Sequence, residues 1–230
     1  MGDYNTVNEE IRAQREKVKK MPWYKQLGHY WHYNKWIIIS IVLGTFFVVS
    51  LIKSAMEHRY SYMTGVLMNS YATESQEKSL EEMYIDAFEI NMKDYTLDFD
   101  CTMNYYLEDP TDVTSINTPA KMVAYSEGKV GDFFICDTET YDFFAKNGYF
   151  ADLSQELPDD LIAKYQDRFY YYNAYDGRGE VPMAIRLETP EIFKTFDGYA
   201  DDDELLFSIF YNGQHTEQAL EFLTFIFETE

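Results

Sequence analysis

The sequence predicts an α/β protein: one transmembrane helix followed by an extracytoplasmic three-layer domain with a mainly parallel sheet. Its 230 residues are enough for one ordinary domain plus attachments. Residues 36–52 form an apolar run without a charged side chain. From residue 64 onward, segments typical of strands alternate with segments typical of helices. That alternation indicates a parallel sheet covered by helices on both faces.

The apolar run WIIISIVLGTFFVVSLI predicts the transmembrane helix. As a helix it spans about 25 Å, near the thickness of a bilayer core, and KSAM extends it to residue 56. A cleaved signal peptide is the main alternative, but 35 residues precede the run and no clear A-x-A site follows it. We therefore expect an uncleaved signal anchor over 36–56. Seven basic residues precede it, which predicts a cytoplasmic N-terminus and an extracellular domain over 57–230.

Residues 1–35 form a basic and aromatic cytoplasmic segment with one short helix near its start. Its stretch GHYWHYNKW contains His29 and His32, whose spacing raises the question of a metal site. Such a site would need further ligands, and neither cysteine reaches it from across the membrane. An interfacial aromatic belt fits better, because Trp and Tyr favour the headgroup zone. The predicted membrane-interface anchors are Trp23, Tyr30, Trp31, Tyr33, Lys35 and Trp36.

Charge divides the chain in two. Residues 1–35 carry seven basic and four acidic side chains, a net of +3, and residues 53–230 carry 12 basic and 36 acidic ones, a net of −24. An acidic domain repels phosphates, which argues against nucleic-acid binding. A solvated acidic surface is the simple interpretation, and attraction for cationic ligands or divalent ions is the alternative. The sequence lacks a CxxC motif, a Cys/His cluster and the common catalytic motifs, so we expect no metal, no cofactor and no enzymatic activity.

Five strands and four helices are expected in the domain. The strands are 64–69, 95–103, 132–137, 180–188 and 204–212. The helices are one after a Thr73–Gln76 capping box, 118–129 with a Thr118 cap, 138–148, and one after a Thr216 cap.

Strand chemistry predicts the order of the first three strands. The first and third are apolar throughout and belong inside the sheet, whereas the second alternates and belongs at an edge, giving the order 2-1-3. Cys101 and Cys136 then lie on strands separated by the first, about 9–10 Å apart, which is too far for a disulfide. We expect two free, buried thiols.

Three stretches carry a resemblance to a known family: GKVGDFFICDTETYDFFAKNGYFADLSQELPDDL (128–161), GEVPMAI and SIFYNGQHTEQALEFLTFIF. They resemble the first lobe of bacterial extracellular solute-binding proteins of the type II periplasmic-binding fold. About 170 residues leave room for one lobe, and a helix stands where Gram-positive members usually carry a lipid-anchored cysteine. The resemblance therefore implies a single-lobe, membrane-anchored variant.

This resemblance implies a non-enzymatic protein that binds a small solute, or an accessory or sensing subunit of a membrane transport or sensor complex. The rival interpretation is a structural or scaffolding envelope protein without a ligand.

Open α/β sheets bind ligands at the carboxyl ends of their strands. That rule selects Asn69 and Ser70 after the first strand, and Asp137 and Thr138 after the third. Thr138 would also cap a helix whose N-terminus could receive an anion. The alternative is that these four are turn and cap residues without a ligand. A run of tyrosines could stack on a sugar, or serve strand packing instead: Tyr170, Tyr171, Tyr172 and Tyr175.

Overall fold

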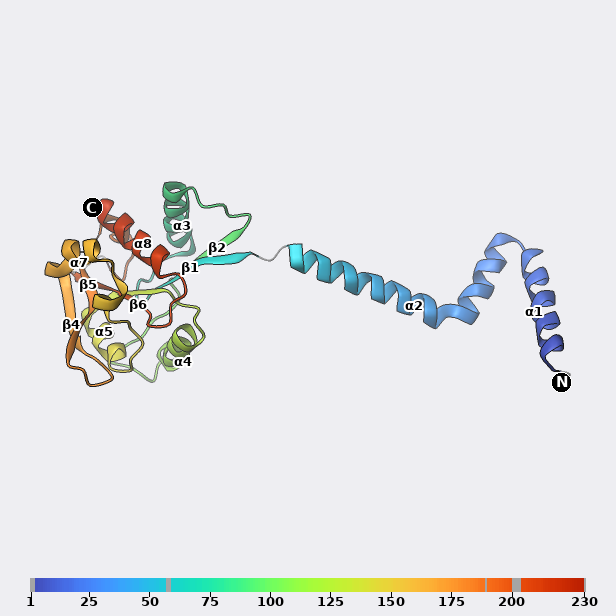
Figure 1. The fold of residues 1–230 in the computed structure, drawn as a ribbon, viewed down its shortest axis with the longest axis horizontal. Coiled ribbons are helices and arrows are strands. Elements are labelled where there is room, and N and C mark those ends of the chain that lie inside the picture. The colour runs from blue at the N-terminus through green and yellow to red at the C-terminus, as the bar shows by residue number, and fades with distance from the viewer. Residues whose placement is uncertain (1–2, 57–58, 189, 200–203, 230) are drawn as a thin grey trace. The chain divides into compact units, whose positions relative to one another are not determined.

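The computed structural model describes residues 3–56, 59–188, 190–199 and 204–229, without the side chains of 3–8, 14, 26–30, 32–34 and 54–56. The chain forms two compact units, Met1–His58 and Arg59–Glu230. Figure 1 labels most of their helices and strands.

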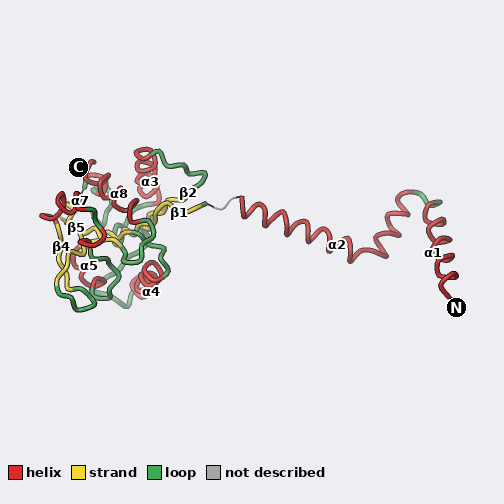
Figure 2. The backbone as a smooth tube through the Cα atoms, in the orientation of Figure 1, coloured by secondary structure: helices red, strands yellow, loops and turns green. Residues whose placement is uncertain are grey.

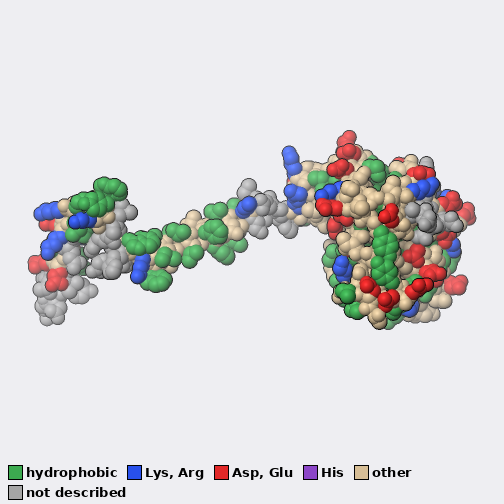
Figure 3. Space-filling view, turned by 180° about the vertical axis from the view of Figure 1, so that it is seen from behind, with side chains coloured by type: hydrophobic (Ala, Val, Ile, Leu, Met, Phe, Trp, Pro, Cys, Tyr) green, Lys and Arg blue, Asp and Glu red, His purple; other side chains and the backbone are tan. Residues whose placement is uncertain are grey.

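The first unit consists of two helices, α1 (Asp3–Lys19) and α2 (Trp23–Met56). Pro22 separates them, because the residue before a proline is disfavoured in a helix. Within α2 the 19 residues Lys35–Lys53 have a mean hydropathy of 2.3, so α2 is long and apolar enough to cross a membrane. Figure 3 shows hydrophobic side chains along this stretch and few charges. The predicted helix of 36–56 thus continues backward by more than three turns.

The second unit is built on a single mixed sheet of six strands, in the order β2-β1-β3-β6-β5-β4. The strands are β1 (Tyr60–Leu67), β2 (Tyr95–Asp100), β3 (Phe133–Asp137), β4 (Phe169–Asn173), β5 (Glu180–Glu188) and β6 (Glu204–Ile209). Strand β1 pairs parallel with β2 and β3, whereas the β3–β6, β6–β5 and β5–β4 pairs are antiparallel. The predicted order 2-1-3 is confirmed, but the prediction of a mainly parallel sheet is wrong.

The connections explain the mixed sheet. Helices connect β1 to β2 and β2 to β3, as parallel neighbours require. Strands β4 and β5 instead form a hairpin whose turn contains Gly177 and Gly179, both with positive φ. Strand β6 lies between β3 and β5 and runs against both. A strand that is buried on both faces is apolar whether it runs parallel or antiparallel to its neighbours. The apolar residues of β5 and β6 therefore do not indicate the direction of these strands.

Helices cover both faces of the sheet (Figures 1 and 2). One face carries α3 (Glu74–Phe88) and α8 (Thr216–Glu228), and the other carries α4 (Val113–Glu127) and α5 (Thr138–Ala145). The short helices α6 (Leu153–Glu156), α7 (Asp159–Tyr165) and η1 (Gln166–Arg168) connect α5 to β4. Alternation along β3 divides the core between the faces: Phe133 and Ile135 join the α3/α8 side, and Phe134 and Cys136 the other.

Beyond the capping box, none of the three predicted Thr caps, Thr118, Thr138 and Thr216, holds the N-cap position of its helix. Helix α4 begins at Val113 with Asp112 as N-cap, so Thr118 lies inside it. The Thr118 hydroxyl donates to the carbonyl of Asn104 at 2.7 Å instead of capping. At α8, His215 rather than Thr216 holds the N-cap position. The Thr73–Gln76 capping box of α3 is confirmed.

Both cysteines are free and buried, as predicted. Leu97, Phe99 and Cys101 alternate inward from β2 and the residue after it. Burial raises the pKa of the Cys101 thiol to about 12. The thiols are therefore apolar packing groups, and Cys101 is held protonated.

Candidate functional site

The four residues predicted to bind a ligand lie together at the carboxyl ends of β1 and β3. The side-chain amide of Asn69 lies 3.4 Å from a carboxylate oxygen of Asp137 and 3.1 Å from the hydroxyl of Thr140. Its oxygen accepts the backbone N–H of Tyr105 at 2.8 Å. Asn69 has φ +60°, a left-handed conformation that asparagine tolerates. These contacts hold the loop after β1 against α5 and the loop after β2.

Asp137, not Thr138, caps α5. A carboxylate oxygen of Asp137 accepts the backbone N–H of Thr140 at 2.8 Å, and Thr138 is the first helical residue. The Thr138 hydroxyl lies 3.5 Å from Glu204, whose carboxylate forms an ion pair with Arg186 at 2.7 Å. The predicted cap residue is thus wrong by one position, because an aspartate at the strand end is the stronger cap.

The segment 190–199 packs over this same end of the sheet. Its ring side chains Phe193, Phe196 and Tyr199 are buried. The hydroxyl of Tyr199 reaches the carbonyls of Met68 and Ile135, at 2.8 and 3.0 Å. The chain itself therefore occupies the space beside the ends of β1 and β3.

The backbone of Gly198 lies directly against Asn69 and Ser70. Its N–H donates to the carbonyl of Ser70 at 3.0 Å, and Ser70 is fully buried. A Cβ at position 198 would lie 1.7 Å from the carbonyl oxygen of Asn69, so only glycine fits. The contacts of Asn69 and Ser70 are those of a packed loop.

A cavity of about 500 Å³ lies at the opposite end of the strands. Tyr211 follows the end of β6, while Val181 and Met183 lie near the start of β5. Strand β6 ends beside Phe133, where β3 begins, so this end is remote from Asp137. The volume falls within the range of small-molecule sites.

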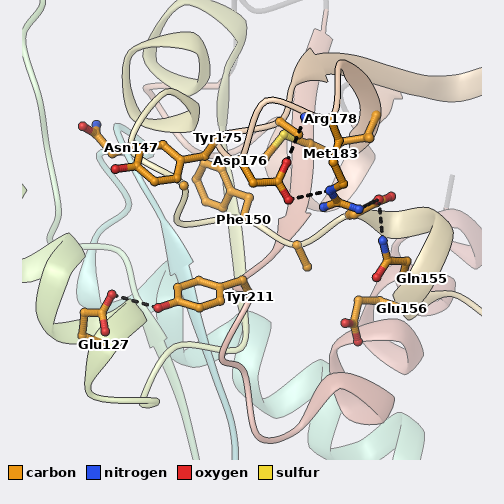
Figure 4. A pocket seen from close by; sticks show the side chains of 15 residues that line it. Glu127, Asn147, Phe150, Gln155, Glu156, Tyr175, Asp176, Arg178, Met183 and Tyr211 are labelled. Carbon is orange, nitrogen blue, oxygen red and sulfur yellow. Dashed lines mark hydrogen bonds and ion pairs between the residues drawn. The ribbon is translucent and has the colours of Figure 1, made fainter.

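The cavity combines charged and aromatic side chains (Figure 4). Arg178 forms ion pairs with Asp176, from Nε at 2.5 Å, and with Asp152, at 3.1 Å. The Asp152 side chain is only 8% exposed. Across the cavity the hydroxyl of Tyr211 donates to Glu127 at 2.8 Å. The pKa of Tyr211 is raised, first by that hydrogen bond and then by burial.

The hairpin turn carries an ion pair between Asp176 and Arg178. The pKa of Asp176 is lowered, chiefly because its carboxylate accepts the backbone N–H of Arg178. The pKa of Arg178 is raised by its hydrogen bond to Asp176. Both groups therefore stay ionised over the physiological range.

Asp132 and His215 form a second polar cluster, outside the cavity. The Asp132 carboxylate is fully buried and accepts the backbone N–H groups of Thr64, Gln214 and His215 at 2.8, 3.0 and 2.9 Å. The ring Nδ1 of His215 lies 3.1 Å from the same carboxylate. Asp132 therefore fastens the segment before α8 to β1.

The predicted tyrosines lie in three different environments. Tyr170 donates to the carboxylate of Asp142 at 2.7 Å, and Tyr172 to its carbonyl at 3.2 Å, which is strand packing. Tyr171 is exposed on the edge strand β4. Tyr175 lines the cavity.

Four of the six predicted membrane anchors have described side chains. Trp23, Trp31 and Trp36 are exposed along α2, and Lys35 lies 5.9 Å from the ring centre of Trp36. Tyr30 and Tyr33 fall on α2, but their side chains lie outside the described residues.

Sequence reasoning missed Arg178, Asp152 and Glu127 as neighbours of one cavity. The available signal is an arginine inside the glycine-containing run DGRG, three residues after Tyr175. Asp152 and Glu127 precede or end helices far away in the chain, so only the folded sheet brings them together.

The fold and the cavity define a class: an α/β domain with a mixed sheet and a ligand-sized cavity, in a chain whose N-terminal helix is long enough to cross a membrane. No family model matches the chain, and no curated protein or solved structure matches it significantly. The function therefore has to be inferred from the residues and their geometry.

Proposed function

We propose that this chain is a non-enzymatic, single-pass membrane protein whose domain binds a small solute outside the cell, at the cavity beside the β4–β5 turn. The observation that carries the proposal is the cavity itself, about 500 Å³ with an arginine, several carboxylates and tyrosine rings in its wall. Solute sites commonly combine such a volume with a few convergent polar groups.

The N-terminal unit supports the membrane part of the proposal. Lys35–Lys53 is apolar enough to span a bilayer. The excess of basic residues before it favours a cytoplasmic N-terminus. Trp23, Trp31 and Trp36 are exposed, as interfacial side chains in contact with lipid would be. The lipid bilayer is thus the first partner.

A test of this orientation uses the buried native thiols as a silent background. We expect a cysteine introduced at exposed Glu180 to react with a membrane-impermeant maleimide in intact cells. One introduced at exposed Glu10 should react only after lysis. The reverse pattern would contradict the proposed orientation.

The single lobe favours an accessory or sensing subunit of a membrane transport complex over a free solute carrier. The resemblance to type II periplasmic-binding lobes agrees with this role. A ligand-free scaffolding protein is the second candidate. It is favoured by one observation, the packing of segment 190–199 against Asn69 and Ser70, where the fold rule places a ligand.

Thermal unfolding of the full chain in nanodiscs separates the two candidates. The panel contains sugars, amino acids, short peptides and amines. A ligand that binds the native state at a hundredfold excess over its Kd adds about 2.7 kcal/mol to the stability. Tyr175→Ala should lower that gain by about 1 kcal/mol, whereas Asp86→Asn, at an exposed position on α3, should preserve it. No gain with any class, and a fixed protein partner co-purifying, would favour the scaffold.

A further inference from the structure

The charges around the cavity are unbalanced. Four carboxylates line it, those of Glu127, Asp152, Glu156 and Asp176, together with one cationic side chain, that of Arg178. The cavity therefore has a net formal charge of −3, inside a domain that is itself strongly acidic. Such a field concentrates cations and repels anions.

Arg178 neutralises only part of this charge. It pairs with Asp176 and Asp152. Glu127 has the hydroxyl of Tyr211 as its hydrogen-bond donor, which is neutral. Glu156 forms no ion pair within the described part of the chain. Two carboxylates at the cavity thus have no counter-ion among the described residues.

Aromatic rings complete the wall. Tyr175 is 75% exposed, and Tyr211 is exposed as well. Among the described residues, neither ring stacks on another ring or receives a cation. Figure 4 shows Glu127 and Tyr211 facing Tyr175 and Asp176 across the cavity. The face of a tyrosine ring attracts a cation.

The ring of Tyr175 lies beside Gly148. A Cβ at position 148 would lie 3.0 Å from the ring of Tyr175, and Gly148 has φ +76°. The glycine therefore lets the ring pack against the chain just after α5. The ring is nonetheless 75% exposed, so one of its faces is open to a ligand.

Two further observations favour an organic cation over a metal ion. Among the described residues, no group of three or more His, Cys, Asp or Glu side chains converges closely enough to hold a metal ion. A cavity of about 500 Å³ is far larger than a metal ion needs. Dispersed carboxylates with open rings suit an organic cation, which is recognised by charge and by ring faces together.

We propose that the ligand of this cavity is a small organic cation, a primary amine or a quaternary ammonium compound. The inference rests on the proposed function, because it names the chemical class that the same cavity takes. Glu127 and Glu156 attract the charge, Tyr175 and Tyr211 contact it, and Arg178 limits the affinity by competing for Asp176 and Asp152.

Calorimetric titration of the full chain in phosphatidylcholine nanodiscs tests the class, with empty nanodiscs as the blank. The probes are putrescine, tetramethylammonium, glucose, glutamate and Ca²⁺. We expect heat from the two cations alone, with an affinity that falls as salt rises. Binding of glucose, glutamate or Ca²⁺ in place of the cations would overturn the cation class but leave a solute-binding domain. No binding of any probe, together with no stabilisation across the wider panel, would overturn both.

Variants assign the binding to the cavity. Glu156→Gln should weaken putrescine by about fivefold, because one uncompensated charge is removed. Tyr175→Ala should weaken tetramethylammonium by about fivefold, whereas Tyr175→Phe, which keeps the ring, should change it less than about twofold. Asp86→Asn, on α3, is the matched control and should leave both affinities unchanged.

Arg178→Gln should change the affinity for cationic ligands and the affinity for anionic ligands in opposite directions. A cationic ligand should bind more tightly, because Asp176 and Asp152 lose their counter-ion. An anionic ligand should lose its only cationic contact within the lining. A loss of putrescine affinity in Arg178→Gln, with thermal stability retained, would refute the assignment of the cation to this cavity.

Discussion

Replacing Asp132 by Ala should destabilise the domain by about 4 kcal/mol. The carboxylate is fully buried and serves as acceptor for three backbone N–H groups from two distant parts of the chain. It also faces the ring of His215 at 3.1 Å. Alanine would leave these donors without their acceptor.

The magnitude follows from where each donor lies. The N–H of Thr64 is in a buried bond and should cost about 2 kcal/mol when it is left unpaired. Those of Gln214 and His215 are partly buried, so water can reach them, and each should cost about 1 kcal/mol. Asp132→Asn keeps one acceptor oxygen but turns an amide donor toward a backbone donor, so about 2 kcal/mol is expected.

Urea unfolding of the full chain in detergent micelles measures these differences. All three tryptophans, Trp23, Trp31 and Trp36, lie in the N-terminal unit, so tryptophan fluorescence does not report on the domain. The near-ultraviolet circular dichroism of the buried tyrosines does. Hydrogen exchange at the Thr64 amide adds a local reading, and it should accelerate in both variants.

A loss below about 1 kcal/mol for Asp132→Ala would refute the reasoning, since it would mean that water or another acceptor satisfies the donors. Asp86→Asn, an exposed substitution on α3, is the control and should stay within about 0.5 kcal/mol of the parent protein.

Three further predictions address other parts of the domain. Gly198→Ala should destabilise it by more than about 2 kcal/mol in the same urea titration, because the new Cβ meets the carbonyl of Asn69; an unchanged midpoint would contradict the close packing. Burial, and then Glu77, raise the pKa of Glu81 above its ordinary 4.5, so the folded state favours its protonated form. Glu81→Gln should therefore raise stability at pH 7 by about 0.5 kcal/mol, and thermal melts should show the gain vanish as the pH falls through the raised pKa toward 4.5. Both cysteines should resist a thiol reagent in the native protein and react as two thiols per chain after unfolding without reductant; fewer than two would indicate a disulfide.

Sequence reasoning succeeded where a local pattern determines the structure. The capping box of Thr73 and Gln76 requires only neighbours in the chain, and so does the alternation that puts Leu97 and Phe99 inside. The separation of Cys101 from Cys136 followed from the order of three strands, which their burial patterns reveal. Strand β5 was predicted with its observed bounds.

Prediction from the sequence failed where contacts between distant residues determine the structure. The direction of β6 depends on which strands flank it, and its own apolar residues are compatible with either direction. Helix α4 begins at Val113 and not at the predicted Thr118, whose hydroxyl donates to the carbonyl of Asn104. The cavity is lined by Glu127, Asp152 and Arg178, which are far apart in the sequence. No spacing in the sequence indicates that these three residues line one cavity.

The position of β6 has a consequence for the order in which the domain assembles during synthesis. Among the described strands it is the last to be synthesised, yet it lies between β3 and β5. Until residues 204–209 leave the ribosome, β3 and β5 each have an open edge, and the β2-β1-β3 and β5-β4 halves have nothing to join them. Open apolar edges pair readily with other chains. We therefore expect the nascent chain to be prone to aggregation while these edges are open, and a chain interrupted before residue 204 should need a chaperone or be degraded.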